Sequence, residues 1–170
     1  RGGLKELDTA QKLARNLLPE ANRNRAMVLA RQGKLDMARD ELKQAIISRP
    51  TDVEFKIELG DIYVALDKLD LAKTEYTQAR DLAQQRPEPC YKIAVVLRKQ
   101  GDAEKKAGKE DAAKKLYEEA LENVKSAISK DDQYAPAYTL QAEILRVLGR
   151  PDDAKKVLDR GIKANPKDPS

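Results

Sequence analysis

The residue types that most often carry out catalysis are scarce in this chain. It contains no histidine, so it has no imidazole base, no histidine pair for a metal and no Ser-His or Cys-His arrangement. The acidic pairs Glu118-Glu119 and Asp152-Asp153 are adjacent in sequence, and on a helix they would point to different faces, as solvated charges do. The glycines stand singly except at the N-terminus, so no phosphate-binding loop is present. We therefore expect no enzymatic activity, no cofactor and no metal site.

The single cysteine also favours a structural role over a chemical one. Cys90 lies between Pro89 and Tyr91 at an expected helix start, where a small apolar side chain fills space. One cysteine forms no disulfide within the chain, so the redox compartment stays open. No apolar run approaches the length of a membrane span, and no signal-peptide pattern is present. We expect no membrane insertion, and the sequence leaves a cytoplasmic or a periplasmic location open.

Composition points to helices and away from nucleic acid. The chain has 170 residues, about one domain's worth, with 36% charged and only 4% aromatic residues. Such a mixture, rich in Ala, Leu, Glu, Lys and Arg, suits a helical array and leaves little for a sheet. The net charge is +4, but the two signs alternate closely, whereas a nucleic-acid binder concentrates its positive charge. RNA binding is therefore the least favoured of the binding functions.

One stretch, residues 53–85, sets the register for the rest of the chain. Apolar residues recur there at helical spacing in two segments that meet at a polar corner around Asp67-Lys68. The first segment carries the pattern L-G-x-x-Y and the second the pattern A-x-x-x-Y-x-x-A. The residues that mark these patterns are Leu59, Gly60, Tyr63, Ala72, Tyr76 and Ala79. Small residues at these places allow two helices to cross closely.

This spacing resembles the tetratricopeptide repeat, a helix-turn-helix unit of about 34 residues. The resemblance implies an all-α solenoid, in which the repeats stack into a right-handed superhelix with a concave groove lined by the first helices. It also implies a protein interaction module, a scaffold or adaptor that holds a peptide or helix of a partner protein in that groove.

Shifting the register by one repeat length divides the chain into a half repeat and four repeats. The half repeat, residues 1–18, is an amphipathic helix that we expect to end before Pro19 and to cap the array. The repeats follow at residues 19–52, 53–86, 87–134 and 135–168, all within one solenoid domain. Because the chain begins without methionine, we expect it to be a piece of a longer protein.

The third repeat breaks the register and then recovers it. The position expected for alanine holds Lys106, and the pattern resumes 14 residues later at Ala120. An extension near residues 101–114, divided between two lengthened helices, would move the corner to Gly108 and keep the apolar stripe in phase. The alternative places the corner at Gly101-Asp102 and a glycine inside the next helix, at a cost of about 1 kcal/mol. We therefore favour the long hairpin.

The last repeat offers an alternative function. No amphipathic helix follows it, so we expect Val157, Leu158 and Ile162 to be partly uncovered. An uncovered flank allows such arrays to stack end to end, so the alternative to peptide binding is a self-associating scaffold that forms a homo-oligomer.

The stripe on each first helix that faces away from the packing residues is the candidate binding surface, which we call the groove stripe. Its members are Arg23, Met27, Arg31, Ile57, Asp61, Val64, Tyr91, Val95, Arg98, Lys99, Glu143 and Arg146. The middle of the stripe is apolar, and cations gather near the corners. We hypothesise a basic groove edge that prefers a partner with acidic residues flanking an apolar anchor.

Some relatives in the resembled family hold a chaperone's C-terminal carboxylate in a clamp of lysines, asparagines and an arginine. The corresponding places here include Glu58 and Glu88, which would repel a carboxylate, and they lack the asparagines. The sequence therefore disfavours that specific function.

Overall fold

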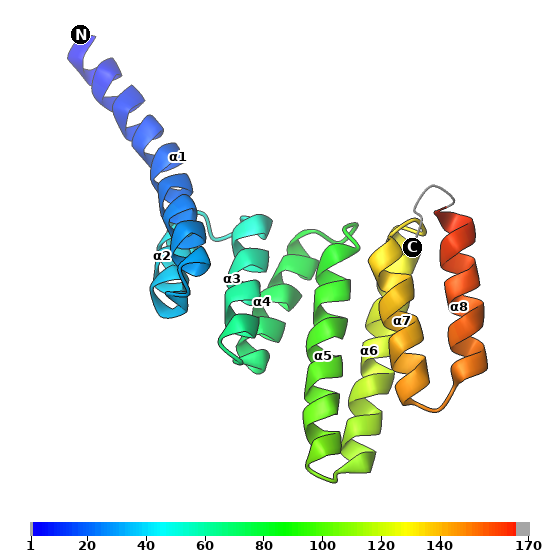
Figure 1. Cartoon of the computed structure of the whole chain (residues 1–170). Helices are drawn as coiled ribbons and strands as arrows, with labels where there is room; N and C mark the ends of the chain where they lie inside the picture. The colour runs from blue at the N-terminus through cyan, green and yellow to red at the C-terminus, as the bar shows by residue number, and fades with distance from the viewer. Residues whose placement is uncertain (1, 166–170) are drawn as a thin grey trace. The chain divides into compact units, whose positions relative to one another are not determined.

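The computed structural model describes the backbone of residues 2–165, and within the first helix it describes the side chains of residues 13, 14 and 18 onward. All regular structure in this part of the chain is helical, as expected for the all-α solenoid class (Figure 1). The eight helices are α1 (Gly2–Arg31), α2 (Leu35–Ser48), α3 (Val53–Ala65), α4 (Leu69–Leu82), α5 (Glu88–Lys106), α6 (Glu110–Lys130), α7 (Ala135–Val147) and α8 (Pro151–Ala164).

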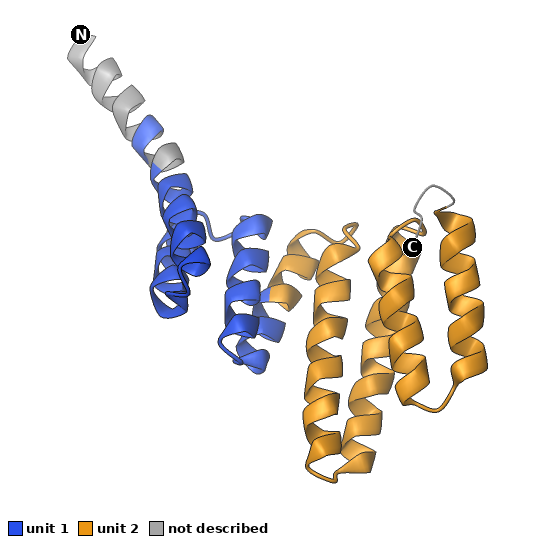
Figure 2. Cartoon of the chain, in the orientation of Figure 1, with its two compact units in different colours: residues 1–75 blue, residues 76–170 orange. Residues whose placement is uncertain are grey.

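The helices fall into two compact units, coloured separately in Figure 2. Unit 1 comprises residues 1–75 and unit 2 residues 76–170, so the boundary lies within α4. In unit 1, α1 packs against α2 and α2 against α3. In unit 2, α5 pairs with α6, α7 pairs with α8, and α7 also contacts both α5 and α6.

The same tight turn joins the helices of each hairpin. Its central residue has a positive φ, between 74° and 76° at Gly33, Gly108 and Gly149 and 57° at Asp67. One residue later, a backbone N–H donates to a carbonyl five residues back, as in Lys34 to Leu29 at 2.9 Å and Arg150 to Leu145 at 2.8 Å. This is the glycine-rich C-terminal cap that satisfies the last carbonyls of a helix. The corners at Asp67 and Gly108 lie where the sequence places them.

Small side chains occupy the helix crossings. The alanines that the register assigns to these crossings are at most 2% exposed: Ala26, Ala38, Ala72, Ala94, Ala120, Ala142 and Ala154. Larger apolar side chains such as Leu42, Tyr76 and Leu97 fill the levels beside them and are at most 1% exposed. Close crossings with larger neighbours on either side allow the paired helices to pack densely against each other.

The hairpin of α5 and α6 is longer than the others, with 19 and 21 residues against 13 and 14 in α3 and α4. Its turn lies at Gly108, so Gly101 is inside α5, where it is buried against the ring of Tyr117. The Tyr117 hydroxyl donates a 2.7 Å hydrogen bond to the carboxylate of Asp102, and burial raises the pKa of Tyr117 to about 12. A glycine in this helix therefore serves to admit an aromatic ring.

The predicted helix boundary at Pro19 is wrong, because α1 runs through this residue without interruption. A proline inside a helix removes one backbone hydrogen bond and costs about 3 kcal/mol. Pro19 is fully buried, and the residues after it lie on the helix that packs against α2. Burial of the proline ring and the packing of α1 against α2 offset the lost hydrogen bond. The helix therefore continues through a residue that, by local rules, would end it. The side chains assigned to the capping helix before residue 13 lie outside the described residues.

Replacement of Gly101 by alanine should lower the melting temperature. Alanine normally stabilises a helix relative to glycine by about 1 kcal/mol. A Cβ at position 101 would lie 2.7 and 2.9 Å from two carbons of the Tyr117 ring, which is buried and anchored through its hydroxyl. Overpacking of this kind costs about 1–3 kcal/mol. Thermal unfolding followed by circular dichroism measures the effect.

The control for this experiment is the same substitution in a Tyr117→Leu background, where the smaller side chain leaves room for the methyl group. There, Gly101→Ala should be neutral or stabilising. A higher melting temperature for the single variant would show that the ring yields and that the close contact is not a constraint.

Replacement of Glu75 by glutamine should stabilise the fold at neutral pH. Burial raises the pKa of Glu75 above its usual 4.5, while Lys56 and Lys43 act in the opposite direction. The folded chain therefore binds this proton more tightly than the unfolded chain, and stability falls as pH rises through the window above 4.5. The variant should melt higher than the wild type at pH 7, and the difference should disappear near pH 4. Equal melting temperatures at both pH values would contradict this, and Glu118→Gln, at an exposed position, is the control.

Candidate functional site

In unit 1, Arg23 of the groove stripe forms an ion pair that links α1 to α3. The Nε of Arg23 donates to both carboxylate oxygens of Glu58 at 2.9 Å. The Glu58 side chain is only 16% exposed, and this hydrogen bond raises the pKa of Arg23. Glu20 also lies 3.9 Å from the guanidinium. The charge of Arg23 is therefore largely offset within the fold.

The other stripe residues of unit 1 differ in exposure. Met27 and Val64 are half-buried, whereas Arg31 and Asp61 are exposed. Ile57, only 3% exposed, belongs to the core and offers almost no surface to a ligand. The accessible surface that these predicted residues offer in this unit is consequently small, with two apolar side chains flanked by charges.

Unit 2 presents a stronger apolar feature. Tyr91 of α5 and Tyr134, the residue before α7, meet edge to face with their ring centres 5.6 Å apart. Burial and the charge of Glu88 raise the pKa of Tyr134 to about 12, so its hydroxyl stays protonated at neutral pH. Val95 is half-buried one turn further along α5. Sequence reasoning missed Tyr134 because it lies outside the first-helix register, and its aromatic side chain directly before a helix start was the only signal.

The charges of the unit 2 stripe are partly paired. Arg98 donates to Glu143 across α5 and α7 at 2.7 Å and lies 3.8 Å from Asp102. Lys99 and Arg146 are exposed and form no ion pair with the described residues. Two carboxylates surround Arg98, so only Lys99 and Arg146 remain available as cations for the hypothesised basic edge in this unit.

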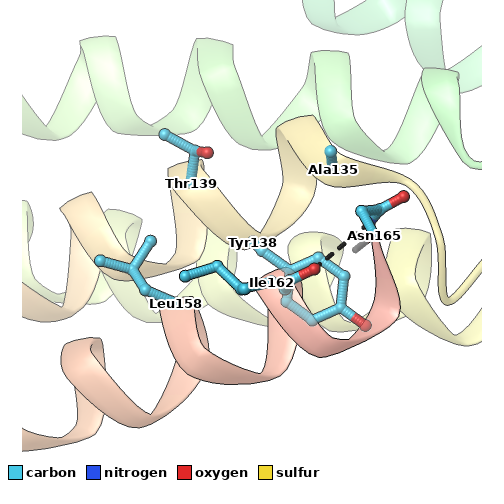
Figure 3. A pocket seen from close by; sticks show the side chains of 7 residues that line it. Ala135, Tyr138, Thr139, Leu158, Ile162 and Asn165 are labelled. Atoms are coloured by element: carbon cyan, nitrogen blue, oxygen red, sulfur yellow. Dashed lines mark hydrogen bonds between the residues drawn. The ribbon is translucent and has the colours of Figure 1, made fainter. Parts of the chain in front are cut away.

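An apolar pocket opens on the last hairpin, between α7 and α8 (Figure 3). Its volume is about 340 Å³, and its lining residues are Ala135, Tyr138, Thr139, Leu158, Gly161, Ile162 and Asn165. The Ile162 side chain is 59% exposed and Leu158 is half-buried. Val157, in contrast, is buried at 6% exposure, so its expected exposure is wrong. Val157 lines a different cleft together with residues of α6 and α7.

The single cysteine lies in a packed environment. Cys90 is fully buried, and its sulfur lies 3.6 Å from the hydroxyl of Ser126, so it packs between α5 and α6. Within the described part of the chain, no three metal-ligating side chains come together. None of the described helices combines the length and apolar character needed to cross a membrane.

Comparison with protein families gives one consistent result. Three models of the tetratricopeptide repeat match the chain, at residues 19–44, 54–126 and 106–170. The second match runs from α3 into α6, and the third begins at the end of α5, so the two overlap on the long hairpin. A comparison with curated protein sequences gave no match.

Several solved structures have a fold similar to that of this chain. TTC0263, a thermophilic tetratricopeptide repeat protein of Thermus thermophilus, is 18% identical with a TM-score of 0.72 over 86% of this chain and 74% of that chain. MamA is 19% identical with a TM-score of 0.67 over 88% of this chain and 79% of that chain. The first tetratricopeptide repeat domain of Spaghetti (RPAP3), bound to the HSP90 peptide SRMEEVD, is 15% identical with a TM-score of 0.63 over 78% of this chain and 94% of that chain. At these identities the similarity is one of fold.

Proposed function

Because the chain belongs to the tetratricopeptide repeat family, we propose that it is a non-enzymatic interaction module that binds a peptide or helix of a partner protein. The observation that carries the proposal is the stripe on α5 and α7 of unit 2. There the half-buried side chains of Tyr91 and Val95 leave some apolar surface accessible, beside the two available cations of Lys99 and Arg146. We also propose that the chain consists of a half repeat, residues 1–18, followed by four repeats.

The chemistry of the stripe favours one type of ligand. Aromatic and arginine side chains with a rigid setting are the residues that most often dominate binding energy at interfaces. Tyr91 is held by its edge-to-face contact with Tyr134 at 5.6 Å, so little conformational entropy is lost when a ligand packs on it. Lys99 and Arg146 would then select acidic residues that flank the apolar anchor.

One related structure supports an acidic ligand. The peptide SRMEEVD, bound to the Spaghetti domain, contains three acidic residues and two apolar ones. The present chain carries Glu58 and Glu88 at places where a terminal carboxylate would be held in that type of complex, so we propose recognition of internal acidic side chains. Capture from an extract of the parent cell would identify the partner.

Charge reversal at Lys99 and Arg146 together should weaken binding of the captured partner about tenfold or more, because both cations would become repulsive. Isothermal titration calorimetry with the purified partner measures the change. The matched control is Lys115→Glu with Lys155→Glu, which makes the same change in net charge at exposed positions of α6 and α8. Affinity that is unchanged in the first variant, or equally reduced in both, would sink the proposal.

A second candidate function is self-association through the apolar pocket of the last hairpin. The pocket of about 340 Å³ and the exposed side chain of Ile162 favour it. Burial of an isoleucine side chain contributes about 1.5–3 kcal/mol, so this residue could be central to such an interface.

If copies associate through this pocket, the weight-average mass from light scattering should rise with concentration for the wild type and stay constant for Ile162→Lys. Asp159→Lys, which also adds positive charge to an exposed position of α8, is the control and should still associate. A monomeric mass for the wild type over the whole concentration series would exclude this candidate.

A further inference from the structure

A second cleft lies in unit 2, between α6, α7 and α8, and nothing described so far uses it. Its volume is about 310 Å³. We call it the outer cleft, and its lining residues are Leu121, Lys125, Gln141, Leu145, Arg150, Asp153, Lys156, Val157 and Arg160. Leu121, Leu145 and Val157 are between 2% and 6% exposed and supply an apolar floor.

Gln141 is the unusual member of this floor. Its side chain belongs to a residue only 7% exposed, and its Oε1 atom is buried without a hydrogen-bond partner in the described part of the chain. A buried acceptor without a partner costs about 1–3 kcal/mol, and native structures contain few of them. Rotation about the last side-chain torsion is broad for glutamine, so this amide can turn toward a donor that enters the cleft.

Positive charge dominates the lining. Four of the nine lining residues are cationic and only Asp153 is anionic. Asp153 lies 2.9 Å from Arg150 and 3.9 Å from Lys156, and it offsets one of these charges. Lys125 pairs with Glu122 at 2.7 Å, but both side chains are more than half exposed, so that pair contributes little. Arg160 forms no ion pair with the residues that the structure describes.

We propose that the outer cleft binds a short acidic peptide segment with one apolar side chain. The apolar side chain would pack on Leu121, Leu145 and Val157, and a backbone N–H of the peptide would donate to the Oε1 of Gln141. Carboxylates on either side would meet Arg160 and the neighbouring lysines. A purely apolar ligand would leave the cations without partners, and a simple anion would leave the apolar floor and the glutamine acceptor unused.

The outer cleft is a different site from the groove stripe. Successive residues of an α-helix are separated by about 100°, so Gln141 and Glu143 point about 200° apart on α7. Leu145 lies on the side of Gln141, and Arg146 lies on the side of Glu143. The inference therefore does not rest on the proposed function of the stripe, and two ligands could occupy opposite sides of α7 at the same time.

A labelled peptide tests the proposal. The probe is acetylated and amidated Glu-Glu-Leu-Glu-Glu carrying fluorescein, titrated with the whole chain and followed by fluorescence polarisation. We expect saturable binding, no binding of the Gln-Gln-Leu-Gln-Gln analogue, and about tenfold or greater loss of affinity for Arg160→Glu. The control is Lys115→Glu with Lys155→Glu, which reverses two exposed lysines that do not line the cleft and should bind the probe as the wild type does.

A second variant separates recognition from folding. Gln141→Leu removes the acceptor without a partner, so it should keep or raise the melting temperature while it lowers probe affinity several-fold. Wild-type affinity in Arg160→Glu would overturn the proposal. Displacement of the probe by inorganic phosphate at constant ionic strength would overturn the peptide assignment, because the site would then be one for simple anions. Loss of probe binding only in the Lys99 and Arg146 variant would place the peptide on the groove stripe instead.

Discussion

The close crossing of paired helices, made possible by alanine and glycine at the contact points, is the constraint on which the rest of the structure depends. A single hairpin of amphipathic helices cannot bury its apolar face alone, so each hairpin is stabilised by its neighbour. With Ala38 and Ala154 fully buried at such crossings, a larger side chain at either place would separate the axes and open the levels beside it. The surfaces available for binding are what remains after this requirement is met.

The long hairpin shows how a repeat can grow without breaking this constraint. Its helices have 19 and 21 residues against 13 and 14 in the preceding hairpin, and its turn at Gly108 lies seven residues beyond the place that the register gives it, which is close to two helical turns. Added whole turns keep the apolar stripe in phase, so Ala113 and Tyr117 are as well buried as residues at the ordinary levels, at 1% and 2% exposure. Gly101 completes the extension, because only a residue without a side chain admits the Tyr117 ring there.

Sequence reasoning succeeded where a single residue type carries a backbone requirement. The corner at Gly108 needs a positive φ that glycine adopts freely, so it could be predicted from the sequence. The predicted helix end at Pro19 was wrong. Packing, which cannot be seen in the local sequence, outweighed the tendency of proline to end a helix. The family and the all-α class followed from the register of small residues, which repeats often enough to be distinctive.

The candidate surfaces were less predictable because they depend on long side chains. Arg98 could be placed on a groove-facing stripe from its helical position, but its partner Glu143 comes from the next repeat, 45 residues away. Ile57 has the same position within its repeat as Tyr91, yet it is 3% exposed and Tyr91 is half-buried. Position within a repeat fixes the direction of a side chain, whereas neighbouring side chains decide how much of it remains accessible.

This distinction also explains why one helix can carry two different surfaces. In α7, the residues that meet α5 lie on one side, and their charge is set by the pair between Arg98 and Glu143. Gln141 lies about 200° away from Glu143 around the helix, at a register position that holds leucine in the second repeat. A leucine there would need no partner, while the glutamine introduces an acceptor that the described fold does not satisfy. The polar exception at an otherwise apolar position is therefore the feature that makes this face of α7 suited to a ligand.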